Sequence, residues 1–286
     1  MREFLKRNLL VFFKDRAAVF FSLLSTLMIL GIYILFLGNI LISEFHDMVP
    51  NAREIMTNWI MAGMIAANTA TTTLGGFGVM VDDRASKIDR DLYVSPISRR
   101  KLAAGYVLSA FIIGSIVTFI TFVVAEIYIF ISCGSLVSLP AFLKVTALIL
   151  LSALSNTSIM FFLTTFFSSP NAFATVSTVV GTVIGFLTGI YIPIGQLPEA
   201  VQWMVKLFPP SYAAVLIRQT MMAESMSAGF AGVPAEYVEK FKMKLGVVLN
   251  FGETEASEAF CIAVLLGAAA VFFLLAVLVL SRKKRE

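Results

Sequence analysis

The side chains that most often carry out chemistry are scarce in this sequence. Its 286 residues include one histidine, His46, and two cysteines, Cys133 and Cys261. They show neither zinc-ligand spacing nor a Cys-His pair with a third partner, and the G-x-S-x-G elbow and the G-x-x-x-x-G-K-[ST] phosphate loop are both absent. We therefore expect no catalytic residues, no metal and no cofactor bound by this chain, and any ATP hydrolysis must occur on another protein.

The densest group of charged side chains lies in residues 82–101, DDRASKIDRDLYVSPISRRK. Six of these residues are basic and four are acidic, whereas charged residues make up only 14% of the whole chain. A solvated loop is one explanation of such a segment, and a surface that docks on another protein is the other. The mixed charge favours a protein partner, because anionic lipid selects segments of nearly pure Lys and Arg.

The composition places this charged segment in a membrane protein. The chain is 58% hydrophobic with a mean hydropathy of +0.89, whereas soluble domains are about 45–50% apolar. A net charge of +4 gives no reason to expect nucleic acid as a partner. A helix needs about 20 apolar residues to cross a bilayer, and a lipid-exposed strand would leave backbone groups unpaired. We predict an all-α polytopic fold of six transmembrane helices at about 17–42, 58–81, 102–132, 145–167, 172–195 and 259–280.

Basic residues predict the orientation of these spans. Residues 1–16 hold five Lys and Arg, residues 82–101 hold six and the C-terminal SRKKRE holds four, against seven in the remaining segments. Both termini and the 82–101 loop are therefore predicted to be cytoplasmic. We expect the protein to be located in the plasma membrane. Residues 1–16 also place Leu5, Leu9, Phe12 and Phe13 on one helical face, which predicts an amphipathic helix in the membrane interface; the alternative is a basic flank that only orients the first span.

Residues 196–258 form the longest extramembrane segment, on the outer side. Pro198, Pro209 and Pro210 interrupt its first part, so we expect short helices that partly re-enter the outer leaflet. VPAEYVEKFKMKLGVVLNF predicts an amphipathic surface helix. We expect Cys133 and Cys261 to be free thiols, with a disulfide between them as the alternative.

Few polar side chains interrupt the spans. In the second span, which is rich in Gly, Ala and Thr, we expect ordinary helix packing or, alternatively, a passage between protomers lined by Asn68, Thr69, Thr72 and Thr73. Glu126, near the outer end of the third span, is expected to be an interfacial carboxylate with a neighbouring partner or a residue that gates the substrate. Lys144 is expected to extend toward the lipid headgroups.

Two motifs give the chain a resemblance to a known family. The loop between the second and third spans matches the pattern L-x-V-[ST]-P-[IL]-[ST]-R through Leu92, Val94, Ser95, Pro96, Ile97, Ser98 and Arg99. The segment after the fifth span matches a P…LP…PxxY…R pattern through Pro193, Leu197, Pro198, Pro210, Tyr212 and Arg218. With the basic N-terminal helix, their order and spacing over nearly the whole chain resemble the membrane subunits of ABC-2-type (type V exporter) ABC transporters.

The resemblance implies a permease that works with a separate ATPase subunit, which carries the ATP and Mg, and with a second permease copy or a paralogue. The 82–101 loop would then dock on the ATPase, with Ser95 capping the next helix and Pro96 in its first turn. The residues implied in this coupling are Lys87, Asp89, Arg90, Asp91, Ser95, Pro96 and Arg99. Many relatives have an E-x-G-T-L-E run ahead of the proline where this chain has Lys87 to Leu92, so the fit to a particular ATPase differs.

The favoured function is thus the membrane subunit of an ATP-driven exporter that moves a hydrophobic or amphipathic substrate, such as a drug, an antimicrobial peptide or a lipid. An exporter of lipid-linked glycan or polysaccharide is the alternative within that class. A membrane regulator that binds an ATPase without transport and an ion-coupled carrier are the alternatives outside it. The dearth of carboxylates within the spans argues against the carrier.

Overall fold

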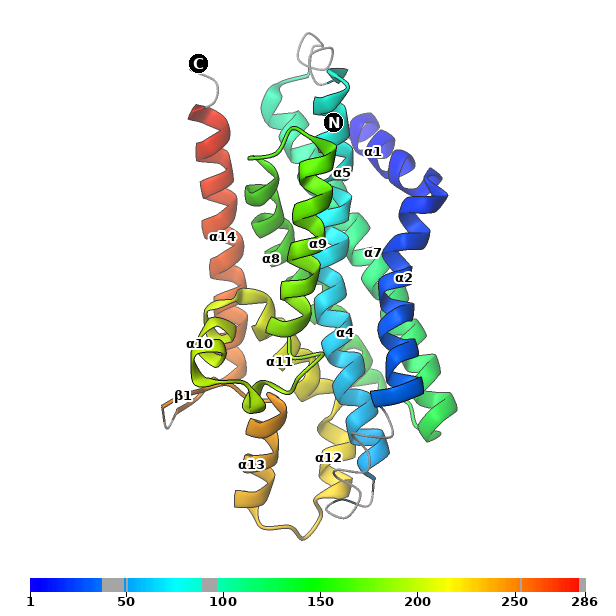
Figure 1. The fold of residues 1–286 in the computed structure, drawn as a ribbon, viewed down its shortest axis with the longest axis vertical. Helices are drawn as coiled ribbons and strands as arrows, with labels where there is room; N and C mark the ends of the chain where they lie inside the picture. The colour runs from blue at the N-terminus through cyan, green and yellow to red at the C-terminus, as the bar shows by residue number, and fades with distance from the viewer. Residues whose placement is uncertain (38–48, 50, 89–96, 253, 283–286) are drawn as a thin grey trace.

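The protein is a bundle of long helices that run roughly along one axis (Figure 1). The computed structural model describes residues 1–37, 49, 51–88, 97–252 and 254–282. The long helices are α2 (Arg16–Ile32), which continues as the π-helix η1 (Tyr33–Leu37), α4 (Ala52–Gly76), α7 (Arg99–Cys133), α8 (Leu139–Thr164), α9 (Pro170–Leu187) and α14 (Glu258–Arg282). The predicted all-α polytopic fold is confirmed.

Helix α4 lies at the centre of the bundle and contacts α2, α7, α8, α9 and α11 (Pro209–Met221). Nearly all its side chains are buried. Among the described residues, five helices are long and apolar enough to cross a membrane, and α4 is not one of them. It has the length, but its Asn, Thr and Gly residues lower its hydropathy. Because other helices surround α4, its polar side chains contact protein and not lipid, so α4 can be less apolar than a helix that faces lipid.

The helix boundaries differ from the predicted spans at several points, and the fourth span, predicted as 145–167, is the helix Leu139–Thr164. The second span, predicted as 58–81, is α4 followed after Phe77 by the short helix α5 (Gly78–Ala85). The third span, predicted as 102–132, begins at Arg99 with Ser98 at the N-cap, and Ser95 and Pro96 lie outside the described residues. The fifth span, predicted as 172–195, ends as a helix at Leu187. Gly189 has a φ of +70°, a backbone conformation that ends a right-handed helix and that glycine adopts without strain.

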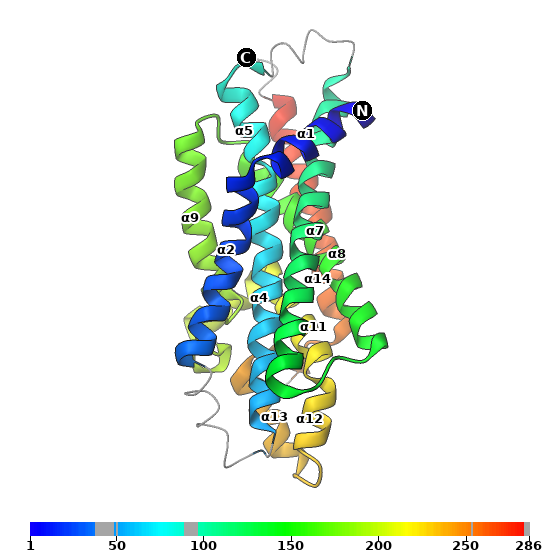
Figure 2. The same ribbon diagram turned by 90° about the vertical axis from the view of Figure 1, so that its right-hand side faces the viewer.

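The two ends of the bundle differ in what they carry (Figures 1 and 2). One end holds α1 (Arg2–Lys14), α5 and the C-terminal end of α14; we call it the α5 end. The other holds α12 (Ala223–Gly229), α13 (Ala235–Leu245) and a two-stranded antiparallel sheet of β1 (Asn250–Phe251) and β2 (Thr254–Glu255); we call it the α13 end. This arrangement places the N-terminal helix, the residues that lead into the charged loop and the end of the last span together.

Helix α1 crosses the α5 end of the bundle and packs on α7 (Figure 2). Asp15 separates it from α2 and accepts hydrogen bonds from the backbone N–H groups of Ala17 and Ala18, which caps α2. The buried stripe of α1 is Phe4, Asn8 and Phe12, whereas Phe13 of the predicted apolar face is exposed; the predicted contact of that face with the membrane interface stays a prediction. The helix is amphipathic, but its inner face contacts protein.

The segment 196–258 contains the short helices that its prolines predict. A 3₁₀ turn, η2 (Ile194–Gln196), leads into α10 (Glu199–Leu207), which is followed by α11, α12 and α13. Helix α11 is buried against α4, α8 and α14, and the predicted partial re-entry of these helices into the outer leaflet stays a prediction. The predicted amphipathic helix near residue 240 is confirmed as α13.

Candidate force-coupling site

Few of the residues predicted to couple the chain to an ATPase fall in the described part. Lys87 is exposed and has a φ of +62°, and Arg99 is the first residue of α7. Asp89, Arg90, Asp91, Ser95 and Pro96 lie outside the described residues. What the structure shows of this site is therefore α5, which leads directly into the charged loop, and the groups to which α5 is bound.

Asp83 of α5 forms the centre of a buried ionic junction. Nη1 of Arg7, in α1, donates to its Oδ2 at 2.5 Å, and Nη2 donates to its Oδ1 at 2.6 Å. The hydroxyl of Tyr106, in α7, also donates to Oδ2 at 2.6 Å. Asp83 is 3% exposed, and a buried carboxylate needs such partners because its desolvation is costly. The junction ties α5 to α1 and α7 at once.

Arg84, the next residue of α5, binds the end of α8. Its Nη1 donates to the backbone carbonyls of Thr164 at 3.0 Å and Phe167 at 2.9 Å. The last carbonyls of a helix lack partners within the helix and carry partial negative charge, so a guanidinium there is favourable. Two consecutive charged residues thus connect α5 to three other helices.

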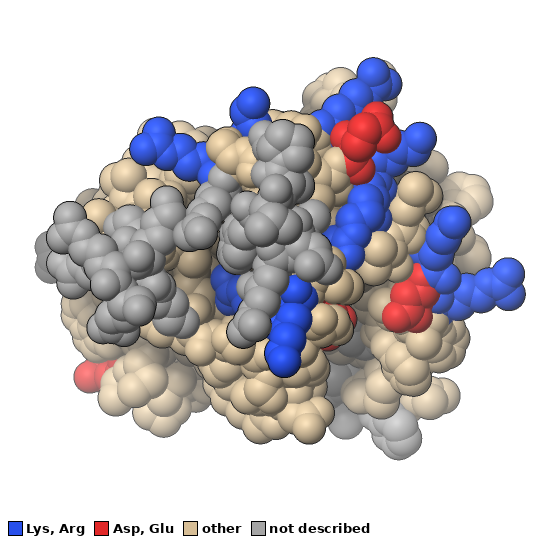
Figure 3. Space-filling model, turned by 90° about the horizontal axis from the view of Figure 1, so that it is seen from above, with Lys and Arg blue, Asp and Glu red and all other residues tan. Residues whose placement is uncertain are grey.

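The same end of the molecule supplies the surrounding packing and charge. The ring of Phe4 meets that of Tyr106 edge to face, with 5.0 Å between the centroids. The pKa of Arg7 lies above its usual value, chiefly because its guanidinium is hydrogen-bonded to Asp83. Partial desolvation raises the pKa of Asp82, and the nearby charges of Asp83 and Asp15 add to that rise. Among the charged side chains on the face seen from this end, Lys and Arg are more prominent than Asp and Glu (Figure 3).

The four α4 residues predicted to line a passage form hydrogen bonds with other residues of the same chain. Nδ2 of Asn68 donates to Oγ1 of Thr121 at 2.6 Å, and the hydroxyls of Thr72 and Thr118 are 3.3 Å apart, which links α4 to α7. On the α8 side, the hydroxyl of Thr69 lies 3.1 Å from that of Ser152.

The hydroxyl of Thr73 donates to the backbone carbonyl of Thr69 within α4. All four predicted pathway residues are buried. The described conformation places these four side chains between helices of one chain. Their predicted role in lining a passage stays a prediction.

Glu126 and Lys144 lie near the α13 end. Oε2 of the buried Glu126 accepts a hydrogen bond from the backbone N–H of Val137 at 3.3 Å, in the loop after α7. Lys144 is exposed and donates to Glu258 of α14 at 2.9 Å. Cys133 and Cys261 are free thiols, at the end of α7 and in α14. None of these side chains joins the junction at α5.

A fully buried cation, Arg218 of α11, connects the central helix to the α13 end. Its side chain is fully buried and lies over the ring of Trp59 in α4, with Cζ 4.7 Å from the ring centroid. Its Nη2 donates to the carbonyl of Gly189 at 3.1 Å, just after α9. Nε1 of Trp59 donates to the carbonyl of Leu245 at the end of α13, at 2.7 Å. Helix α4 is thereby attached to α9, α11 and α13.

Neither junction can be recognised from the sequence, for the same reason. Asp83 and Arg84 belong to the charged segment 82–101, and Arg218 is one residue of the outer motif. Asp83 stands 76 positions from Arg7, and nothing in a single sequence pairs residues so far apart. Asp83 and Arg84 directly follow an apolar run, and this position is a weak indication that they are paired. In the sequence, however, a paired charge at such a position cannot be distinguished from a solvated one.

Comparison with known proteins agrees with this architecture. No curated protein matches the chain. The family model described as ABC-2 type transporter matches residues 1–222, which includes the α5 junction and α11 with Arg218. With an all-α fold, five membrane-length apolar helices and a family match over most of its length, the chain belongs to the ABC-2 type transporter family and is a membrane permease component.

Proposed function

We propose that this protein is the permease subunit of an ATP-driven exporter in the plasma membrane, with the α5 end in the cytoplasm. The family implies pairing with an ABC ATPase subunit. The proposed cargo is hydrophobic or amphipathic, and the transporter is completed by a second copy or a paralogue of this chain. The exposed basic residues of the α5 end support this orientation, because Lys and Arg favour the cytoplasmic side.

The observation that carries the proposal is the attachment of α5. This helix leads directly into the loop that contains Asp89, Arg90, Asp91, Ser95 and Pro96, which we propose as the ATPase contact together with Lys87 and Arg99. Through Asp83 and Arg84, α5 is bound to α1, α7 and α8. A displacement of the loop by an ATPase would therefore move four helices together, whereas a loop joined by a flexible linker would move alone.

Helices α4 and α7 are packed closely enough to transmit such a displacement across the membrane. A Cβ on Gly76 would lie 2.9 Å from Cα of Ala110, so the two helices approach closely, as small residues allow in membranes. The hydrogen bonds of Asn68 and Thr72 add to this contact. We infer that α4 and α7 move as a unit and that Trp59 and Arg218 pass the motion to the helices of the α13 end.

The test is to purify the chain with the ATPase encoded beside it and to measure complex formation and ATP hydrolysis in lipid. Asp91→Lys reverses a charge in the proposed contact and should weaken both. Glu236→Lys is the matched control, because it makes the same change on the exposed surface of α13, at the opposite end. If no ATPase co-purifies, or if Asp91→Lys behaves like wild type while Glu236→Lys is impaired, the proposed coupling surface is wrong.

A further inference from the structure

Helix α10 turns a stripe of apolar side chains away from the rest of the protein. Trp203, Met204 and Leu207 are 60%, 62% and 86% exposed, and Ala200 is also exposed. These four residues lie at positions i, i+3, i+4 and i+7, which is one face of a helix. Val205, on another face, is buried. A helix on a water-facing surface points its polar face outward, so the outward stripe of α10 requires an apolar environment.

Aromatic contacts that run from α10 through Phe251 of β1 to the start of α14 indicate the depth of α10. The ring of Trp203 lies 6.4 Å from that of Phe251, which lies 5.8 Å from that of Phe260 in the first turn of α14. Glu258, the first residue of α14, forms an exposed ion pair with Lys144 in the second turn of α8, so charged groups lie near the α13-end termini of these two apolar helices. Helix α10 therefore lies where the apolar part of the bundle ends.

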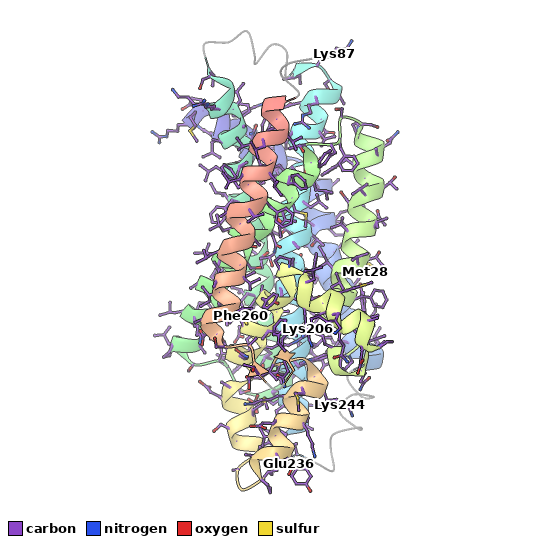
Figure 4. All side chains as sticks on the ribbon, turned by 90° about the vertical axis from the view of Figure 1, so that its left-hand side faces the viewer. Met28, Lys87, Lys206, Glu236, Lys244 and Phe260 are labelled. Atoms are coloured by element: carbon purple, nitrogen blue, oxygen red, sulfur yellow. The ribbon has the colours of Figure 1, made fainter. Side chains whose placement is uncertain are left out.

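The view of Figure 4 agrees with this depth. Lys206 of α10 lies at the level of Phe260, whereas Lys244 and Glu236 of α13 lie farther along the axis. Nζ of Lys206 is 4.9 Å from the ring centroid of Trp203 and 5.6 Å from that of Phe251. It forms no ion pair with a carboxylate of the described residues. A cation held beside aromatic rings, next to an apolar stripe, suits a phospholipid, whose phosphate lies directly above its acyl chains.

We propose that α10 is an interfacial lipid-binding helix on the α13 side of the membrane. Its stripe of Ala200, Trp203, Met204 and Leu207 lies against acyl chains, and Lys206 binds the phosphate of the same phospholipid. The proposal depends on the position of α10 beside the spans and does not depend on an ATPase partner.

The two tryptophans of the chain make this surface measurable. Trp59 is 1% exposed and Trp203 is 60% exposed, so lipid-dependent fluorescence quenching reports Trp203. The full chain is placed in phosphatidylcholine bilayers with bromine either near the glycerol end or near the middle of the acyl chains. We expect stronger quenching by the shallow bromine, because interfacial helices sit about 5–10 Å into the headgroup and acyl boundary. The Trp203→Phe variant should lose most of the quenching.

Two other outcomes would overturn the proposal. Quenching of Trp203 by iodide in water, without quenching by brominated lipid, would place α10 in solvent. Protection from both quenchers would mean that a second copy of the chain covers the stripe.

The role of Lys206 is tested by charge reversal. Lys206→Glu should weaken quenching by the shallow bromine, because a carboxylate is repelled by the phosphate. Lys244→Glu makes the same change on α13, beyond the lipid boundary, and should leave the quenching unchanged. Equal quenching in wild type and Lys206→Glu would refute phosphate binding.

Discussion

The ionic junction at α5 allows a quantitative prediction, because its two charges differ in burial. Asp83 has a side-chain exposure of 4% and Arg7 one of 34%. Among the described residues, Arg7→Met leaves the buried carboxylate with only the Tyr106 hydroxyl as a donor, whereas Asp83→Asn leaves a guanidinium that water can still reach. We therefore predict that Arg7→Met destabilises the protein more than Asp83→Asn does.

The magnitudes follow from the contacts. Leaving one charge of a buried pair unpaired costs about 3–5 kcal/mol. Because the hydrogen bond from Tyr106 to Asp83 remains in Arg7→Met, we expect this variant to lose about 3 kcal/mol of stability. Hydrogen bonds to charged groups contribute about 1.5–3 kcal/mol each, and access of Arg7 to water reduces the loss in Asp83→Asn to about 1.5–2 kcal/mol. The double variant should cost no more than Arg7→Met alone, which corresponds to a coupling energy of about 1.5–2 kcal/mol.

The free energy of unfolding is measured by denaturation in mixed micelles for wild type, both single variants and the double variant. Lys240→Met is the matched control, because Lys240 forms an ion pair with Glu236 on the exposed surface of α13; it should change stability by less than about 1 kcal/mol. Additive effects in the double variant, or a larger loss for Asp83→Asn than for Arg7→Met, would refute the junction as described.

Two further substitutions test the path through the bundle. Gly76→Ala should be about 1–3 kcal/mol less stable than Gly75→Ala, since overpacking costs about that much: a Cβ on Gly76 meets the backbone of Ala110, whereas one on Gly75 meets nothing within 4 Å. Equal stability of the two variants in the same denaturation assay would contradict the close approach of α4 and α7. Arg218→Lys should cost about 2 kcal/mol, because one ammonium cannot replace a guanidinium that both stacks on Trp59 and donates to a backbone carbonyl. Wild-type stability in this variant would show that the Arg218 contacts are not needed.

The long helices could be predicted because uncharged runs of membrane length leave few alternatives. Two of the differences between prediction and structure have causes that can be read in the residues. Gly189 and Pro193 stand where the fifth helix has already ended, and both disfavour a continued helix. The Thr and Gly residues of α4 suit a helix enclosed by others more than one that faces lipid.

The contacts that join the helices could not be predicted in the same way. The partner of Asp83 lies in α1, and the partners of Arg218 lie in α4 and just after α9. Composition shows a charge but not whether it is paired, and one sequence holds no information on which distant residues vary together. The polar residues of α4 can be identified from the sequence. Which of them contact α7 and which contact α8 depends on the packing angle of the three helices.

The central claim, that an ATPase contacts this chain at the α5 end, is tested most directly by photo-crosslinking in membranes. A photo-reactive amino acid is placed at Lys87, which is exposed beside the charged loop, or at Tyr237, which is exposed on α13 at the opposite end. We predict an adduct with the ATPase from position 87 and none from position 237. An adduct from position 237, with none from position 87, would contradict both the orientation and the coupling site.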